Sequence, residues 1–251
     1  MRLALMADVH ANREAFEACL ADADVKRAER IVFLGDYVNY GADPDWVVGT
    51  IMGLVASGRA VAIQGNHDAA ASAKNGARNG GMDSSLESAL AWTRNQLGGD
   101  QRAFLAALPL TLEEGECLFV HAEASQPAKW SYVTDPREAE RSLRATARRI
   151  TFTGHVHRPA VYNLPEGSKP GWFRPVPGVA VPLLARRRWL VVGGSVGQPR
   201  DGNPAACWTL LDSAKAEVTV HRVPYEVEET ARKIRRAALP EIYAERLAFG
   251  Q

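Results

Sequence analysis

The feature that most constrains this chain is the placement of its histidines. Five of the six histidines in the 251 residues lie in short polar clusters, and each cluster directly follows an apolar run that is predicted to be a β-strand. The pair Gly35-Asp36 places a carboxylate after another such run. Loops at the carboxyl ends of strands in an open α/β sheet converge on one crevice. The fold is therefore expected to bring these clusters together.

Apolar runs and helical periodicity alternate in the first part of the chain. Strands are predicted at 3–7, 31–34 and 61–64, and helices at about 13–23 and 44–57. This β-α-β-α-β order predicts an α/β architecture with a largely parallel sheet. Further helices are predicted at 84–97, 100–107, 136–149, 225–238 and 241–248, and further strands at 116–120 and 150–153.

Two stretches differ from the rest of the chain in composition and pattern. The small, polar and glycine-rich segment 69–83 is predicted to be a mobile loop. After residue 158, strand-like runs at 189–192, 206–211 and 217–223 predict antiparallel strands that form a second sheet. No composition shift marks a linker, so we expect one domain over residues 1–251, with the helices of 225–251 packed on its core.

The composition excludes several classes of protein. With 46% hydrophobic residues the chain can build a sizeable core, and a net charge of +1 gives no support for a protein that mainly grips nucleic acid. Cys19, Cys117 and Cys207 match no C-x-x-C spacing and are expected to be buried apolar residues. No apolar stretch can span a bilayer, and a strand that begins at residue 2 leaves no room for a signal peptide. We expect a cytoplasmic protein.

The polar clusters contain the ligand types of a divalent metal site. The candidate ligands are Asp8, His10, Asp36, Asn66, His121, His155 and His157. Residues two apart in a strand-like segment point to the same side. Asp8 with His10, and His155 with His157, can therefore each present two donors to one place. Imidazoles, carboxylates and an amide without thiolates suit Mn, Fe, Co, Ni or Zn. Seven donors fit two ions that share a carboxylate, roughly 3.5–4 Å apart.

His67 and Asp68 directly follow the candidate ligand Asn66 and are not themselves assigned as ligands. A histidine held by a carboxylate can protonate a leaving alkoxide or stabilise developing charge. Two divalent ions would exceed the charge of two aspartates, so the residual positive field would attract a phosphate and lower the pKa of a bridging water. These residues together predict a hydrolytic site.

The ordered motifs D-x-H, G-D, G-N-H-D, H and G-H-x-H over residues 8–157 resemble those of the calcineurin-like metallophosphoesterases. The resemblance implies a four-layer αββα sandwich of two mixed β-sheets flanked by helices, with the metal site at the C-terminal ends of the strands. It implies one metal held by Asp8, His10 and His157, a second held by Asn66, His121 and His155, and Asp36 as the bridge. It also implies that His67 is the general acid, oriented by Asp68.

The second motif, Gly35-Asp36-Tyr37-Val38-Asn39-Tyr40-Gly41, lacks the Asp-Arg pair of the large eukaryotic-type Ser/Thr phosphatases. Together with the loop 194–204 and the break at Leu239-Pro240, it resembles a compact prokaryotic phosphoesterase subfamily. We therefore predict a dinuclear metal phosphatase or phosphodiesterase. It would hydrolyse a phosphomonoester or phosphodiester of a small substrate by attack of a metal-bridging hydroxide.

Two alternatives remain open from the sequence. A nuclease or cyclic-nucleotide phosphodiesterase would use the same site and differ in substrate. A metal-binding scaffold without catalysis belongs to a different class, and it is disfavoured because neither the acid nor any ligand is missing.

Several other residues are weaker candidates. Tyr40 can line the pocket, and Arg158 and Arg200 can contact phosphate, although a tight turn with a local salt bridge is favoured for Arg200-Asp201. His221 is alone on a late strand and is predicted to be structural. Two basic runs are interpreted as surface features, a solvated helix face and an exposed hairpin; their residues are Arg137, Arg141, Arg144 and Arg148, and Arg186 to Arg188.

Overall fold

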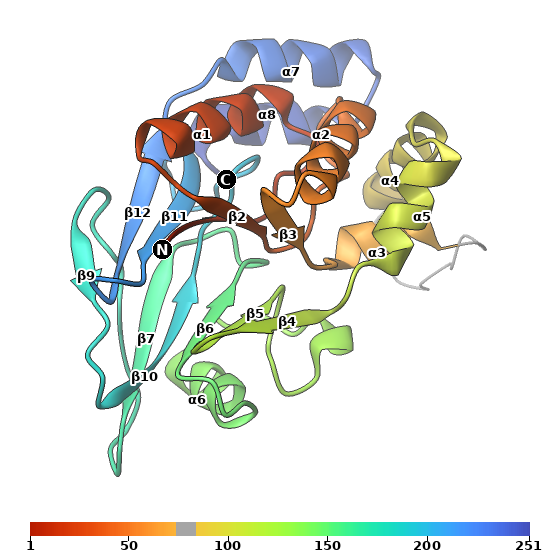
Figure 1. Cartoon of the computed structure of the whole chain (residues 1–251). Helices are drawn as coiled ribbons and strands as arrows, with labels where there is room; N and C mark the ends of the chain where they lie inside the picture. The colour runs from red at the N-terminus through yellow and green to blue at the C-terminus, as the bar shows by residue number, and fades with distance from the viewer. Residues whose placement is uncertain (74–83) are drawn as a thin grey trace.

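Two mixed six-stranded sheets form the centre of the molecule (Figure 1), in a computed structural model that describes residues 1–73 and 84–251. Sheet A has the order β3 (Ala60–Ala62), β2 (Arg30–Phe33), β1 (Arg2–Met6), β11 (Ala206–Asp212), β12 (Glu217–Val223) and β9 (Ala180–Pro182). Sheet B has the order β4 (Thr111–Glu114), β5 (Cys117–Val120), β6 (Ile150–Thr153), β10 (Arg187–Val192), β7 (Ala160–Pro165) and β8 (Gly171–Phe173).

The parallel strands β1 and β2 are buried on both faces, which explains their nearly continuous apolar sequences. Leu3 and Leu5 point into the core between the two sheets, whereas Ala4 and Met6 point into the core under the helices. This alternation follows from the two-residue period of a strand. Phe119 of β5 and Phe152 of β6 stack in the inter-sheet core with ring centroids 5.7 Å apart.

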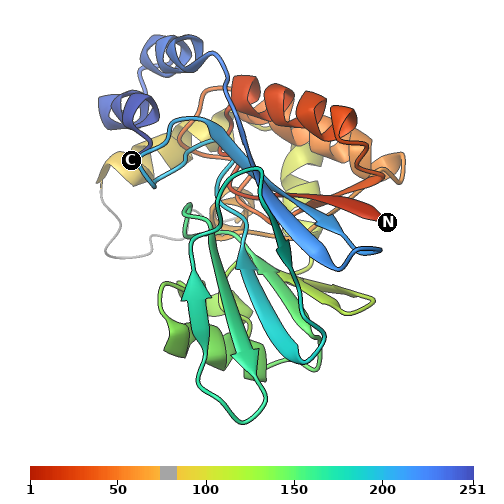
Figure 2. The same cartoon turned by 90° about the vertical axis from the view of Figure 1, so that its left-hand side faces the viewer.

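Helices cover the outer faces of both sheets (Figures 1 and 2). Helices α1 and α2 pack on sheet A, with α7 and α8 beyond them, and α6 packs on sheet B. Helices α3, α4 and α5 gather at one end of the molecule. The helices are α1 (Arg13–Val25), α2 (Pro44–Ala56), α3 (Asn66–Ser72), α4 (Ser84–Gln96), α5 (Gly99–Ala107), α6 (Pro136–Arg144), α7 (Val227–Arg236) and α8 (Glu241–Phe249), with a short 3-10 turn at Pro127–Lys129.

The four-layer α/β arrangement of two mixed sheets is confirmed. Two local predictions were wrong. The segment 69–83 was predicted to be a loop throughout, but α3 continues to Ser72; residues 74–83 lie outside the described part of the chain. The helix expected over 136–149 ends at Arg144, and the Thr146 hydroxyl then accepts the backbone N–H of Arg148 as the chain turns toward β6.

The strands after residue 158 do not form a sheet of their own. β9, β11 and β12 extend sheet A, and β7, β8 and β10 extend sheet B. The join in sheet A is an antiparallel pairing of β11 with β1, and the join in sheet B is a parallel pairing of β10 with β6. Strands β11 and β10 thereby bury their apolar faces against strands from the first part of the chain.

Candidate metal centre

Five strands, β1, β2, β3, β5 and β6, each end directly before one of the polar clusters. Sheet A supplies Asp8, His10, Asp36 and Asn66, and sheet B supplies His121, His155 and His157. The candidate ligands therefore come from both sheets and meet at the edge where the two layers adjoin.

The backbone at these residues is unusual. Five candidate ligands have left-handed φ angles: Asp8 (54°), His10 (48°), Asp36 (57°), His155 (66°) and His157 (61°). Such conformations cost of order 1 kcal/mol or more each and persist only where the surroundings hold them. Backbone hydrogen bonds between neighbouring loops supply that support: Asp8 N–H to Gly35 O, His10 N–H to Asp36 O, and Gly154 N–H to His121 O, each 3.0 Å.

Two glycines let these loops approach closely. A Cβ on Gly65 would lie 2.2 Å from Asp36 Oδ1, and a Cβ on Gly35 would lie 2.8 Å from His121 Nδ1. Gly35 also has a φ of +92°, which other residues rarely adopt. The glycines of the G-D and G-N-H-D motifs are therefore required by the space around the ligands.

Four imidazoles share one mode of anchoring. One ring nitrogen of each lies within hydrogen-bond distance of a backbone carbonyl: His10 Nδ1 and Val38 O (3.0 Å), His121 Nδ1 and Leu34 O (2.7 Å), His157 Nδ1 and Gln198 O (2.7 Å), and His155 Nε2 and Trp130 O (2.9 Å). A carbonyl can only accept, so that nitrogen carries the proton. The opposite nitrogen presents a lone pair, and this is the arrangement that orients a metal-ligating histidine.

The free nitrogens of these rings face one another. His10 Nε2 lies 3.2 Å from His157 Nε2, and His121 Nε2 lies 3.2 Å from His155 Nδ1. Asn66 Oδ1 also lies 3.2 Å from His121 Nε2. Lone pairs that face each other at such distances repel unless a cation or a proton lies between them, so the donor set fits divalent metal ions.

Asp36 lies between the two groups of donors. Its Oδ2 is 3.2 Å from His121 Nε2 and 3.9 Å from His10 Nε2. Three sets of ligand atoms can each hold an ion among the described residues: Asp8, His10 and His157; His10, Asp36 and His67; and Asp36, His121 and His155. The structure thus brings together all seven sequence-predicted ligands, with one carboxylate common to two of these sets.

Burial and charge set the protonation of the cluster. Burial lowers the pKa of His10 and His157 well below the usual range, and burial followed by the charge of His121 lowers the pKa of His155 to about 3. Burial raises the pKa of Asp8 to about 8. Burial opposes the charged form of His121 as well, but the adjacent Asp36 outweighs it and raises the pKa of His121 to about 9.

His67 lies at the rim of the cluster and is anchored in another way. Its Nδ1 is 2.9 Å from Asn39 Nδ2 and its Nε2 is 3.2 Å from Tyr40 Oη. Its backbone N–H donates to Asp36 Oδ1 at 2.9 Å, and its ring packs edge-on against His10 with centroids 5.0 Å apart.

The expectation that Asp68 orients His67 is wrong. The Asp68 carboxylate accepts three backbone N–H groups, from Asp36 (2.8 Å), Tyr37 (2.9 Å) and Gly65 (2.9 Å). Adjacent residues of a helix point in different directions, and both residues lie in the first turn of α3. Asp68 instead joins the loop that carries Asp36 to the start of α3.

Of the weaker candidates, Tyr40 and Arg200 lie at the site. The Tyr40 ring contacts His10 with centroids 4.5 Å apart, and the Arg200 guanidinium lies 5.7 Å from the centroid of that tyrosine ring. Arg158 is exposed, and its Nε donates to the backbone carbonyl of Arg200 at 2.6 Å. It therefore supports the loop that carries Arg200.

The remaining surface interpretations can be compared with the structure directly. Asp201 pairs with Arg222 of β12, so the expected salt bridge does not stay within its own turn. In the basic run of 137–148, three arginines pair with glutamates: Arg141 with Glu123, Arg144 with Glu140 and Arg148 with Glu113. Arg188, near the start of β10, donates to two backbone carbonyls. The His221 ring packs on Trp208, with ring centroids 4.7 Å apart.

Sequence reasoning missed three residues around the site. Asn39 contacts His67, and its only sequence signal is its place three residues after Asp36. The half-exposed Tyr132 stacks on His155 with centroids 4.1 Å apart, and no motif marks it. The Ser195 hydroxyl donates to Asp8 O at 2.8 Å and accepts the Gln198 N–H at 2.9 Å, which fixes the loop that anchors His157.

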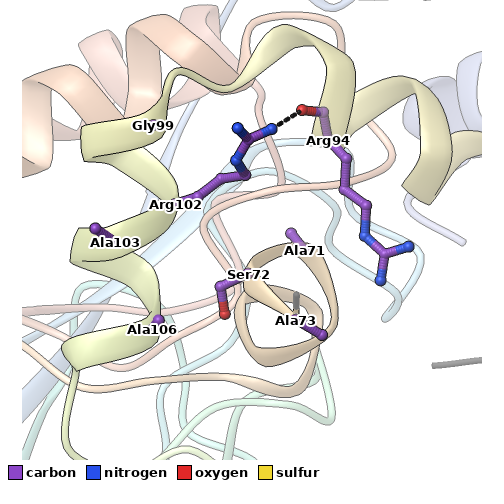
Figure 3. Close-up of a pocket in the computed structure, with 8 residues that line it drawn as sticks. All are labelled: Ala71, Ser72, Ala73, Arg94, Gly99, Arg102, Ala103 and Ala106. Carbon is purple, nitrogen blue, oxygen red and sulfur yellow. Dashed lines mark hydrogen bonds between the residues drawn. The ribbon is translucent and has the colours of Figure 1, made fainter. Parts of the chain in front are cut away.

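A cavity of about 520 Å³ lies apart from this cluster, between the end of α3 and helices α4 and α5 (Figure 3). Its arginines are occupied by backbone carbonyls, because Arg94 donates to Ala70 O and Arg102 donates to Arg94 O. Among the residues that the structure describes, no carboxylate or imidazole lines it, so it does not compete with the histidine cluster as the candidate site.

Two other expectations concern the described residues. All three cysteines are free and buried, as predicted. No helix in residues 1–73 or 84–251 is long and apolar enough to cross a membrane.

Known proteins resemble this chain over most or all of its length. A family model for the calcineurin-like phosphoesterase superfamily domain matches residues 1–215. The uncharacterized protein MJ0912 of Methanocaldococcus jannaschii is 30% identical over 253 residues, which cover 99% of this chain and 98% of that protein. A metallophosphoesterase from Sphaerobacter thermophilus has a crystal structure that matches with a TM-score of 0.85, 32% identity and full coverage of both chains.

The hypothetical protein PH1004 from Pyrococcus horikoshii OT3 shares the fold, with a TM-score of 0.79 at 19% identity over 100% of this chain and 98% of that one. The family model and the two relatives at 30% and 32% identity, which span nearly the whole chain, establish the family. This chain belongs to the calcineurin-like phosphoesterase superfamily, a family of hydrolases.

Proposed function

We propose that this chain is a two-metal phosphoesterase that hydrolyses a phosphomonoester or phosphodiester of a small substrate. The observation that carries the proposal is the set of four carbonyl-anchored imidazoles, whose free nitrogens face one another and the Asp36 carboxylate. Divalent cations bound there would lower the pKa of a water molecule toward neutrality and polarise the phosphoryl group. The residues of the chain then have to bind the ester and stabilise its leaving oxygen.

The distances support a division of the ligands between two ions. Asp8, His10 and His157 would hold one ion, and Asn66, His121 and His155 the other. Asp36 would bridge them, because its carboxylate is within 4 Å of a ring nitrogen from each group. Imidazole and carboxylate donors without thiolates suit Mn, Fe, Co, Ni or Zn.

Arg200 is proposed to bind the phosphate. Its Nε is buried and has no hydrogen-bond partner within the described residues, while its Nη2 donates to Gln198 Oε1 at 2.8 Å. An unpaired buried donor is costly, and a phosphate oxygen would satisfy it with a charge-assisted hydrogen bond. The positive charge of Arg200 also acts on Asp8 and His157, which places it within electrostatic reach of the metal ligands.

His67 is proposed to act on the leaving oxygen, with Tyr40 beside it. The His67 ring packs against His10, and its Nε2 is 4.0 Å from Asp36 Oδ2. His67 belongs to one of the three possible sets of ligand atoms, but the two proposed sets are complete without it.

The test is a substrate panel combined with a metal panel. Purified protein freed of metal would be supplied in turn with Mn, Ni, Co, Zn and Mg, and assayed with p-nitrophenyl phosphate, bis(p-nitrophenyl) phosphate and single-stranded DNA. We expect metal-dependent hydrolysis of an aryl ester that disappears in Asp36→Asn. Cleavage of DNA in preference to both small esters would favour a nuclease. Bound metal without hydrolysis of any substrate would favour a scaffold.

A further inference from the structure

The hydrogen bonds of Asn39 reveal which nitrogen of His67 carries the proton. Asn39 is fully buried, and its Oδ1 accepts the backbone N–H of Tyr40 at 3.0 Å. This contact fixes the orientation of the side-chain amide, because only its oxygen can accept. The amide nitrogen must then be the atom that lies 2.9 Å from His67 Nδ1.

An amide nitrogen can only donate, so His67 Nδ1 must accept with its lone pair. In a neutral imidazole one nitrogen carries the proton and the other accepts, and the proton of His67 is therefore on Nε2. A doubly protonated ring would set an N–H of His67 against the NH₂ of Asn39 at 2.9 Å. The arrangement around Nδ1 thus favours a neutral ring with its N–H directed toward Tyr40 Oη, 3.2 Å away.

We propose that Asn39 is a positioning residue that holds His67 as the Nε2–H tautomer, so that His67 acts on the substrate as a hydrogen-bond donor that keeps its proton. The kinetic part of this inference rests on the proposed phosphoesterase function. A neutral imidazole can stabilise a developing negative charge without giving up its proton. A water oxygen would form a new P–O bond while the P–O bond to the leaving oxygen breaks with its electron pair on that oxygen. The leaving oxygen would accept the hydrogen bond from Nε2 and take its proton from solvent water.

A carboxylate in place of Asn39 would have the opposite effect. It would accept a hydrogen bond from a protonated Nδ1, stabilise the imidazolium and make His67 competent to transfer a proton. Asp68 cannot take this part, because three backbone N–H groups occupy its carboxylate. The Asn39→Asp variant is therefore a matched test: aspartate keeps the acceptor for Tyr40 N–H and tolerates the left-handed φ of 73° at this position.

The first measurement needs no activity. Two-bond ¹H–¹⁵N correlation spectra of the zinc-loaded protein identify the protonated nitrogen of each histidine ring, and His67→Ala assigns the signals of His67. We expect Nδ1 of His67 to be unprotonated and Nε2 to be protonated in the parent protein, and Nδ1 to become protonated in Asn39→Asp. A protonated Nδ1 in the parent protein would overturn the proposal.

The second measurement compares leaving groups. We expect His67→Ala to reduce kcat by a similar factor for p-nitrophenyl phosphate and for phenyl phosphate, whose leaving oxygen is much more basic. We expect Asn39→Asp to raise the rate on phenyl phosphate relative to p-nitrophenyl phosphate. A loss in His67→Ala that grows with the basicity of the leaving oxygen would contradict a donor that keeps its proton. Absence of hydrolysis in the parent protein would count against the proposed function, while the tautomer would still be decided by the spectra.

Discussion

The histidines of this protein fall into two regions that differ in what anchors them. In the candidate metal centre, four rings each lie against a backbone carbonyl, an acceptor that directs the ring proton away from the site; they belong to His10, His121, His155 and His157. At the rim, His67 lies against the amide nitrogen of Asn39, a donor that leaves the ring proton on the side of the site. The comparison teaches that the group on the far nitrogen decides whether a histidine presents a lone pair or an N–H to the site.

The largest effect should come from removing one histidine of each region. We expect His157→Ala to lose metal and to reduce hydrolysis to background, because its ring nitrogen belongs to a set of ligand atoms. We expect the matched variant His67→Ala to keep its metal and to lose about 10²–10³-fold in kcat, the usual cost of one donor to a developing charge. Metal analysis of both purified variants, beside p-nitrophenyl phosphate kinetics, checks this. Loss of metal in His67→Ala would show that His67 is also needed for metal binding and would contradict the separation of the two regions.

An intermediate effect should follow from loosening a carbonyl anchor. Ser195→Ala removes the hydroxyl that accepts the Gln198 N–H and donates to Asp8 O, so the carbonyl that orients His157 is less well held. Residues that orient a metal ligand without binding the metal typically contribute about 10–100-fold to metal affinity. We therefore expect Ser195→Ala to bind metal more weakly, with kcat nearly restored at saturating metal. Titration with a competing chelator measures the affinity. Unchanged affinity would show that the carbonyl needs no such support.

A smaller and graded effect should appear in the pH dependence of metal uptake. The pKa of Asp8 is raised to about 8 and that of His121 to about 9, so both carry protons near pH 7 in the metal-free protein. A cation must displace these protons, and its apparent affinity should therefore rise with pH and level off above about 9. Calorimetry in buffers of different ionisation enthalpy would count the released protons. A release of none at pH 7 would contradict the prediction.

The convergence of the candidate ligands could be predicted because each follows a strand with a clear apolar sequence. The donors of Asp8 and His10, for example, come directly after β1. The anchors of the imidazoles could not be predicted, since every residue has a carbonyl and nothing in the sequence marks those of Val38 or Gln198. The left-handed backbone of the ligands is likewise set by contacts between loops rather than by residue type.

The errors have physical causes of their own. Asp68 was assigned to His67 because the two are neighbours in sequence, whereas the first turn of α3 directs the carboxylate toward backbone N–H groups. The strands after residue 158 were grouped because they follow one another, but β11 pairs with β1 and β10 with β6 across long intervals. Such pairings depend on complementary apolar faces in the assembled core, which local patterns do not specify.

Because the candidate ligand atoms are divided between the two sheets, the affinity for a metal ion bound there would depend on the spacing between the layers. Phe119 and Phe152, stacked in the core between the sheets, lie two and three residues before His121 and His155. A cavity made by Phe152→Ala, distant from any solvent, would change how far apart the two halves of the donor set are held. Cation affinity would thus register damage to the apolar interior of the protein while the chain is still folded.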